Sequence, residues 1–119
     1  MSEIKTFAMQ IANLIDDKKG YDIKVLDVRH LSSIADYFVI ASGTSSRHVE
    51  SLAENVKESL SKKGIEAAYV EGKKNANWVI LDYKDVVAHV FQGDDRAFYG
   101  LERMWNDAVE VKMNFEDFV

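Results

Sequence analysis

The segment spanning residues 78–91 constrains the fold of this chain most strongly, because it contains two short apolar runs on either side of an acidic, aromatic turn. This pattern is typical of a β-hairpin. If Tyr83 and Lys84 are the two turn residues, Asp82 stands directly opposite Asp85. Successive side chains of a strand point to opposite faces, so the pairing also predicts which residues share a face.

The two faces of this hairpin differ in chemistry. One face is purely aliphatic and is predicted to be core, with Val79, Leu81, Val86, Ala88 and Val90. The other face is mixed and is predicted to be at least partly exposed, with Trp78 opposite His89, Ile80 opposite Val87, the Asp82–Asp85 pair, and Phe91. Two carboxylates facing each other repel unless a basic group compensates them, which makes the mixed face a candidate surface for a basic partner. For Trp78, both a core position and a partner contact remain open.

Around the hairpin, the chain alternates helical and strand patterns. An amphipathic helix is expected from an N-cap at Ser2 to a stop at residues 18–20, and another from a cap in residues 43–46 to a stop at 62–64. Strands are expected over residues 22–29, 37–41 and 67–71, and the continuous apolar run 37–41 predicts a central strand that is buried on both faces.

After Gly93, Asp94 or Asp95 is expected to cap a last helix, followed by an alternating tail over residues 109–119. The side chains predicted to face inward from this helix are Phe98, Leu101, Met104, Trp105 and Ala108. The element order αββαβββα predicts an α/β fold in which helices pack on a mixed β-sheet. Residues 1–119 are expected to form a single domain.

Composition and charge narrow the function classes. The chain has no cysteine, no long apolar span and no basic leader, and we therefore expect a cytoplasmic protein without a membrane segment. Residues 1–63 carry nine basic and nine acidic groups, so the net charge of −5 comes entirely from the second half. Such a balance disfavours direct nucleic-acid contact and favours a basic protein partner.

Catalytic sites are weakly indicated. The turn over residues 43–48 follows a buried strand like a phosphate cradle, but it lacks the lysine and the second glycine of a P-loop, so a simple turn with an N-cap is the favoured interpretation. Asp82 and Asp85 could share a metal, although no third ligand is evident, and the three histidines have no zinc-site spacing. We expect no catalytic residue, no metal and no cofactor.

Four stretches carry a resemblance to a known family. They are residues 36–49, the Glu71–Gly72 pair, residues 78–91 and residues 96–105, and together they resemble the ribosomal silencing factor (Iojap-like) family over residues 3–108. The resemblance implies a non-enzymatic, nucleotidyltransferase-like fold that binds the large ribosomal subunit through ribosomal protein fourteen. It also implies translational repression, because a protein bound there blocks joining of the small subunit.

The residues that the resemblance marks as partner surface are Trp78, Asp82, Tyr83, Asp85, His89, Arg96, Tyr99 and Glu102. Lys84 and Gly100 depart from the family, which usually has glycine and aspartate at these positions. Lys84 therefore requires either a positive φ or a different turn. The alternative function is a nucleotidyltransferase-like or nucleotide-binding protein that uses the turn at residues 43–46. For the free protein, the sequence leaves both a monomer and a homodimer open.

Overall fold

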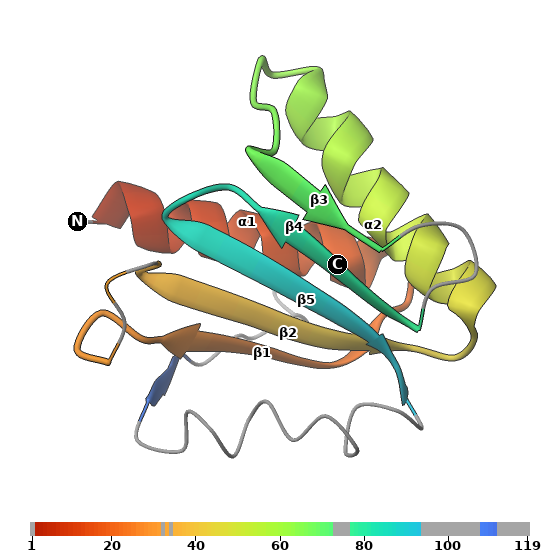
Figure 1. Cartoon of the computed structure of the whole chain (residues 1–119), viewed down its shortest axis with the longest axis horizontal. Helices are drawn as coiled ribbons and strands as arrows, with labels where there is room; N and C mark the ends of the chain where they lie inside the picture. The colour runs from red at the N-terminus through yellow and green to blue at the C-terminus, as the bar shows by residue number, and fades with distance from the viewer. Residues whose placement is uncertain (1, 32, 34, 73–76, 94–107, 112–119) are drawn as a thin grey trace.

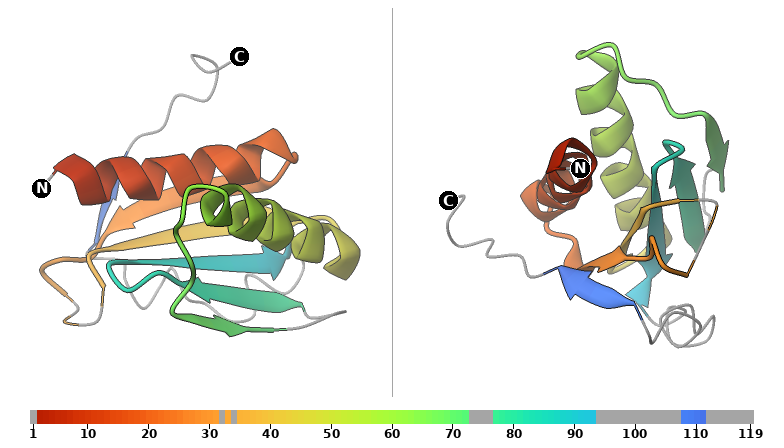
Figure 2. Two further views of the ribbon diagram at one scale, coloured as in Figure 1. Left: turned by 90° about the horizontal axis from the view of Figure 1, so that it is seen from above. Right: turned by 90° about the vertical axis from the view of Figure 1, so that its left-hand side faces the viewer.

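A computed structural model of the chain describes residues 2–31, 33, 35–72, 77–93 and 108–111. The elements in chain order are α1 (Ser2–Asp17), β1 (Tyr21–Asp27), β2 (Tyr37–Gly43), α2 (Ser46–Ser61), β3 (Tyr69–Glu71), β4 (Trp78–Asp82), β5 (Val86–Gln92) and β6 (Val109–Val111). The strands form one six-stranded sheet in the order β3-β4-β5-β2-β1-β6 (Figure 1). Both helices pack on the same side of this sheet (Figure 2). The predicted α/β fold with a mixed sheet is confirmed.

The sheet is mixed because β2 and β5 run parallel while every other neighbouring pair is antiparallel. All seven residues of β2 are buried, which confirms the prediction of a central strand covered on both faces. The chain enters β2, crosses over through α2, and returns at β3 on the far edge of the sheet. The hairpin β4–β5 then fills the gap between them.

The two helices follow the apolar stripes of the sequence. The buried side chains of α2 are Val49, Leu52, Ala53, Val56 and Leu60, the stripe that the spacing predicts. Helix α1 ends where Lys19 adopts a φ of +68° and the Gly20 N–H donates to the carbonyl of Ile15. A Cβ on Gly20 would lie 2.4 Å from the Ile15 side chain, so the close return of the chain at this point requires glycine. Within the described residues, neither helix is long and apolar enough to cross a membrane.

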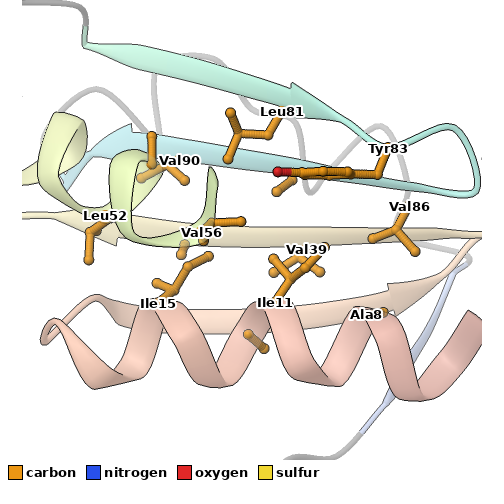
Figure 3. Packing of buried hydrophobic residues seen from close by; sticks show 14 of the residues in the cluster. Ala8, Ile11, Ile15, Val39, Leu52, Val56, Leu81, Tyr83, Val86 and Val90 are labelled. Atoms are coloured by element: carbon orange, nitrogen blue, oxygen red, sulfur yellow. The ribbon is translucent and has the colours of Figure 1, made fainter. Parts of the chain in front are cut away.

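The aliphatic face of the hairpin lies in the main core, as predicted. Figure 3 shows Leu81, Val86 and Val90 pointing toward side chains of α1, α2 and β2. Tyr83 extends this core, and its ring meets the ring of Phe7 edge to face at 5.6 Å. The helices are therefore held to the sheet by one continuous apolar cluster.

The predicted register of the hairpin is wrong by two residues. Asp82 pairs with Val87 and Trp78 with Phe91, so Asp82 does not stand opposite Asp85. The turn residues are Lys84 and Asp85, because the Tyr83 N–H donates to the carbonyl of Val86 at 2.9 Å.

Three contacts explain why the chain prefers this later turn. Lys84 has a φ of +75° and the Asp85 N–H donates to the carbonyl of Tyr83, the pattern of a γ-turn. The Asp82 carboxylate accepts a hydrogen bond from the Lys84 N–H at 2.7 Å, and the Asp85 carbonyl accepts from the backbone of Asp36. The shift also moves Tyr83 out of the turn and into the core. A slip of two residues keeps every side chain on its predicted face, so the face assignment survives the wrong register.

The opposite face of the sheet carries a second apolar cluster. Its buried members come from three strands and the β1–β2 connection, namely Leu26, Val28, Ala35, Phe38, Ile40, Val87 and Phe91. Trp78, Ile80 and Ala108 pack against it and are half-buried. The mixed face of the hairpin is thus partly exposed, but Phe91 and His89 are more buried than the sequence pattern predicts.

The C-terminal part is described only at residues 108–111. The predicted helix beginning at Asp94 or Asp95, with Phe98, Leu101, Met104 and Trp105, lies outside the described residues. Val109–Val111 form β6, which pairs antiparallel with β1, so the first residues of the alternating tail are a strand.

Candidate protein-interaction site on the β4–β5 hairpin

The candidate site is the face of β4 that points away from the helices. Trp78, Ile80 and Asp82 alternate along this strand and are all half-buried, whereas Val79 and Leu81 point into the core. A shallow hollow of about 470 Å³ lies beside them and is lined by Glu71, Gly72, Asn77, Trp78 and Ile80. The face therefore combines an aromatic ring, an aliphatic side chain and carboxylates next to a depression.

The indole of Trp78 is held in place by two ring contacts. It stacks on Phe91 with ring centroids 5.0 Å apart and an interplanar angle of 26°. Its Nε1–H donates to Nδ1 of His89 at 3.2 Å. The predicted cross-strand partnership of Trp78 and His89 is confirmed, although the two residues are diagonal neighbours and not directly opposite. An indole fixed in this way loses little freedom when a partner covers its exposed part.

His89 supports Trp78 from below the surface. It is 7% exposed, and its ring also meets Phe38 edge to face at 5.1 Å. Because Nδ1 accepts the indole hydrogen bond, the proton of the neutral imidazole resides on Nε2, which has no hydrogen-bond partner among the described residues. Burial lowers the pKa of His89 to about 4, opposed by the negative charge of Asp82. The imidazole is therefore neutral at physiological pH and accepts a hydrogen bond.

The two hairpin carboxylates play different parts. Asp82 is half-buried and accepts from the backbone of the turn, whereas Asp85 is exposed. The predicted arrangement of two directly facing carboxylates is wrong, because Asp82 pairs with Val87 and Asp85 lies in the turn. No group of three or more potential metal-ligating side chains gathers within the described residues.

The other predicted partner-surface residues divide into two sets. Tyr83 is 9% exposed and belongs to the core, where burial raises the pKa of its phenol. Little of its surface is left for a partner. Arg96, Tyr99 and Glu102 lie outside the described residues, and their roles stay predictions. The structure therefore brings Trp78, Asp82 and His89 together, with Asp85 at the adjoining turn.

Three residues around Trp78 were not assigned to the site from the sequence, although the Glu71–Gly72 pair was part of the family resemblance. Glu71 ends β3, Gly72 directly follows it and Asn77 directly precedes β4, and all three line the hollow beside the indole. Gly72 has a φ of +96°, and a Cβ there would lie 2.5 Å from the Trp78 carbonyl oxygen. In the sequence, the glycine that directly follows the strand ending at Glu71 could have indicated that the backbone passes close to another segment here.

The alternative site, the turn at residues 43–46, is filled by the chain itself. Ser45 caps α2 by accepting from the His48 N–H at 3.1 Å. The Thr44 N–H donates to Nδ1 of His48 at 2.9 Å, and Nε2 of His48 contacts the Lys18 carbonyl at 2.8 Å. The imidazole thus occupies a backbone donor that a phosphate cradle would need, which supports the interpretation of a turn with an N-cap.

Comparisons with known proteins agree with the resemblance noted in the sequence. The family described as "Ribosomal silencing factor during starvation" matches residues 1–118. The chain is 42% identical over 106 residues to the ribosomal silencing factor RsfS of Halalkalibacterium halodurans. The aligned region covers 88% of this chain and 91% of that protein. It is also 30% identical to a mouse protein named "Mitochondrial assembly of ribosomal large subunit protein 1", over 80% of this chain and 43% of that protein.

A solved structure shows the same fold. A crystal structure of a protein from Bacillus halodurans superimposes with a TM-score of 0.79 at 37% sequence identity, covering 91% of this chain and 99% of that chain. The match covers nearly the full length of both chains, so the likeness extends well beyond the single motifs. The chain therefore belongs to the ribosomal silencing factor family.

Proposed function

We propose that this protein is a translational repressor that binds the large ribosomal subunit through ribosomal protein fourteen and sterically blocks joining of the small subunit. Membership of the silencing factor family and the name of the mouse relative support a ribosome-associated silencing or assembly role. The observation that carries the proposal is the half-exposed indole of Trp78, fixed by His89 and Phe91 on a sheet face opposite the two helices.

The chemistry of this face suits a basic protein partner. A large aromatic side chain with its polar atom satisfied is a typical anchor of a protein interface. Asp85 is exposed at the turn, and Glu71, which pairs with Ile80, is exposed beside the hollow on the β3 side. These carboxylates would orient a basic partner and increase the association rate, while the apolar contact with Trp78 would supply most of the affinity.

Steric repression requires no catalytic group. A protein that occupies the contact surface of one subunit prevents association in proportion to its own occupancy. The enzymatic alternative is testable by titrating the protein with nucleoside triphosphates and Mg²⁺ and following thermal unfolding. We expect no shift, whereas a nucleotide at a hundredfold excess over its Kd would stabilise the fold by about 2.7 kcal/mol.

The test of the proposal is sedimentation with purified ribosomal subunits. We expect the protein to co-sediment with large subunits and to reduce the yield of joined ribosomes when small subunits are added afterwards. Binding should weaken as salt is raised, because exposed charges are screened beyond about 8 Å at physiological ionic strength. Co-sedimentation with small subunits, or unchanged binding to large subunits that lack ribosomal protein fourteen, would contradict the proposal.

A further inference from the structure

Strand β3 forms one edge of the sheet, and no described strand pairs with its outer side. All three of its residues are exposed, and Tyr69 and Val70 retain 55% and 38% of their accessible surface. Figure 1 shows this edge next to α2. An edge with unpaired backbone groups and exposed apolar side chains is a template on which another extended chain can pair.

Each face of the sheet has a hollow beside this edge. On the helix side, a cavity of about 340 Å³ lies between α2 and the β3–β4 strands. Its lining includes the apolar side chains of Ala53, Val70 and Val79 and the carboxylates of Glu50 and Glu54. On the other side lies the hollow of about 470 Å³ beside Trp78 and Ile80.

The register of β3 places alternate side chains on the two faces of the sheet, so one strand added beside β3 could reach both hollows. Val70 pairs with Leu81 and shares its face, toward the helices, whereas Glu71 pairs with Ile80 and faces the opposite way. A new strand alongside β3 would point successive side chains alternately to these two faces. One set would enter the cavity under α2, and the other would reach the hollow beside Trp78.

The charges of the helix-side cavity favour a cationic side chain. Glu50, Glu54 and Lys57 all line this cavity, and Lys57 compensates one of the two carboxylates through a contact with Glu54 at 3.4 Å. The lining therefore keeps one negative charge. A lysine or arginine has an apolar stem that can cover Val70 and a cationic end that can reach the carboxylates. The other face offers indole and isoleucine surface, which suits an aliphatic side chain.

We propose that the outer edge of β3 is a docking site for an extended segment of a protein partner in which basic and aliphatic residues alternate. The segment would pair with β3 as a seventh strand, placing its basic side chains under α2 and its aliphatic side chains beside Trp78. Backbone hydrogen bonds would hold the segment, and the two hollows would select its sequence. This inference rests on the proposed function to the extent that both use the surface beside Trp78, but it concerns the chemistry of the bound segment, and the peptide test below needs no ribosome.

The test uses the whole protein and a short capped peptide in which valine alternates with lysine or arginine. Calorimetry gives the Kd, and amide hydrogen exchange locates the bound segment. We expect saturating peptide to slow exchange of the backbone amides of residues 69–71 by about tenfold or more. A peptide with glutamate in place of every basic residue, and one with proline at its centre, should not bind.

Matched charge reversals on α2 separate the cavity from general electrostatics. Glu54→Lys should weaken peptide binding about fivefold, because it reverses a charge that lines the cavity. Glu58→Lys makes the same change one turn further along, at an exposed position that is not part of this lining, and should leave the Kd within about twofold. Equal weakening by both variants, or slowed exchange elsewhere in the sheet, would overturn the proposal. So would sedimentation showing that two copies of the chain pair through β3, since the edge would then already be occupied.

Discussion

Replacing His89 should remove a large part of the acid sensitivity of this fold. In the native protein, burial depresses the pKa of His89 from 6.5 to about 4. The unfolded chain regains the ordinary value, so between these two pKa values the unfolded state binds a proton that the folded state does not. Stability is therefore fully present above about pH 6.5, falls as the pH drops toward about 4, and then levels off with respect to this group.

The size of the effect follows from the two pKa values. Over the whole window the loss approaches about 3 kcal/mol, and about 2 kcal/mol of it falls between about pH 7.5 and about pH 5. Protonation would also put a hydrogen on Nδ1, where the indole Nε1–H of Trp78 now donates at 3.2 Å. Asp27, whose pKa is lowered mainly by its hydrogen bond with Arg29, acts in a different range. Its contribution is lost only as the pH falls below about 4, so it does not confuse the measurement.

The assay is urea unfolding of the wild type and His89→Phe at about pH 7.5 and about pH 5. Phenylalanine keeps an aromatic ring beside Phe38 and Phe91 and removes both the titrating group and the unpartnered Nε2–H. We expect the wild type to lose about 2 kcal/mol more than this variant on acidification. Equal losses for wild type and His89→Phe would refute the assignment of a buried, neutral imidazole.

Three further predictions concern the hairpin. Trp78→Ala should abolish large-subunit binding in co-sedimentation and lower the free energy of unfolding by about 2 kcal/mol, which is the low end of the roughly 2–5 kcal/mol that we expect for the fully buried Leu81→Ala. A folded Trp78→Ala protein that still binds would mean that the partner contacts another surface. Asp82→Ala should cost about 1 kcal/mol in urea unfolding, because the Lys84 N–H loses its acceptor, whereas Asp85→Lys should leave stability unchanged and weaken binding. Lys84→Gly should increase the free energy of unfolding, measured in urea, by about 0.5 kcal/mol, since glycine adopts a φ near +75° without strain. An unchanged free energy of unfolding would mean that lysine adopts this φ without strain.

The sequence predicted correctly which side chains face the core, because side-chain periodicity controls this property. The buried stripe of α2 and the aliphatic face of the hairpin were correct because a wrong face would expose whole sets of valine and leucine. The register was not correct, since a slip of two residues conserves both faces and periodicity cannot detect it. The turn was decided instead by local contacts at Asp82 and Tyr83, which only the folded backbone brings together.

Long-range neighbours limited the prediction of the site. His89 and Phe91 are buried because Phe38 and Ile40 of β2 lie beside β5 and contribute to the same cluster. The sequence did contain an indication of this burial, because the segment that forms β5 is largely apolar on both faces and such a strand has to be covered on both faces. The pairing of β2 with β5 was still not predictable, because these strands are separated by α2, β3 and β4 along the chain.

The two faces of strand β4 separate the residues that hold the fold together from those that we propose bind a partner. Val79 and Leu81 of β4 bind the sheet to the helices, and their neighbours Trp78 and Ile80 face away from that core. We therefore expect a substitution on the outward face to change the proposed interaction surface at a modest cost in stability, as long as His89 beneath it stays neutral and hydrogen-bonded to the indole. His89 is the exception to this separation, because it is both buried and hydrogen-bonded to Trp78, so we expect its protonation state to affect stability and the proposed binding together.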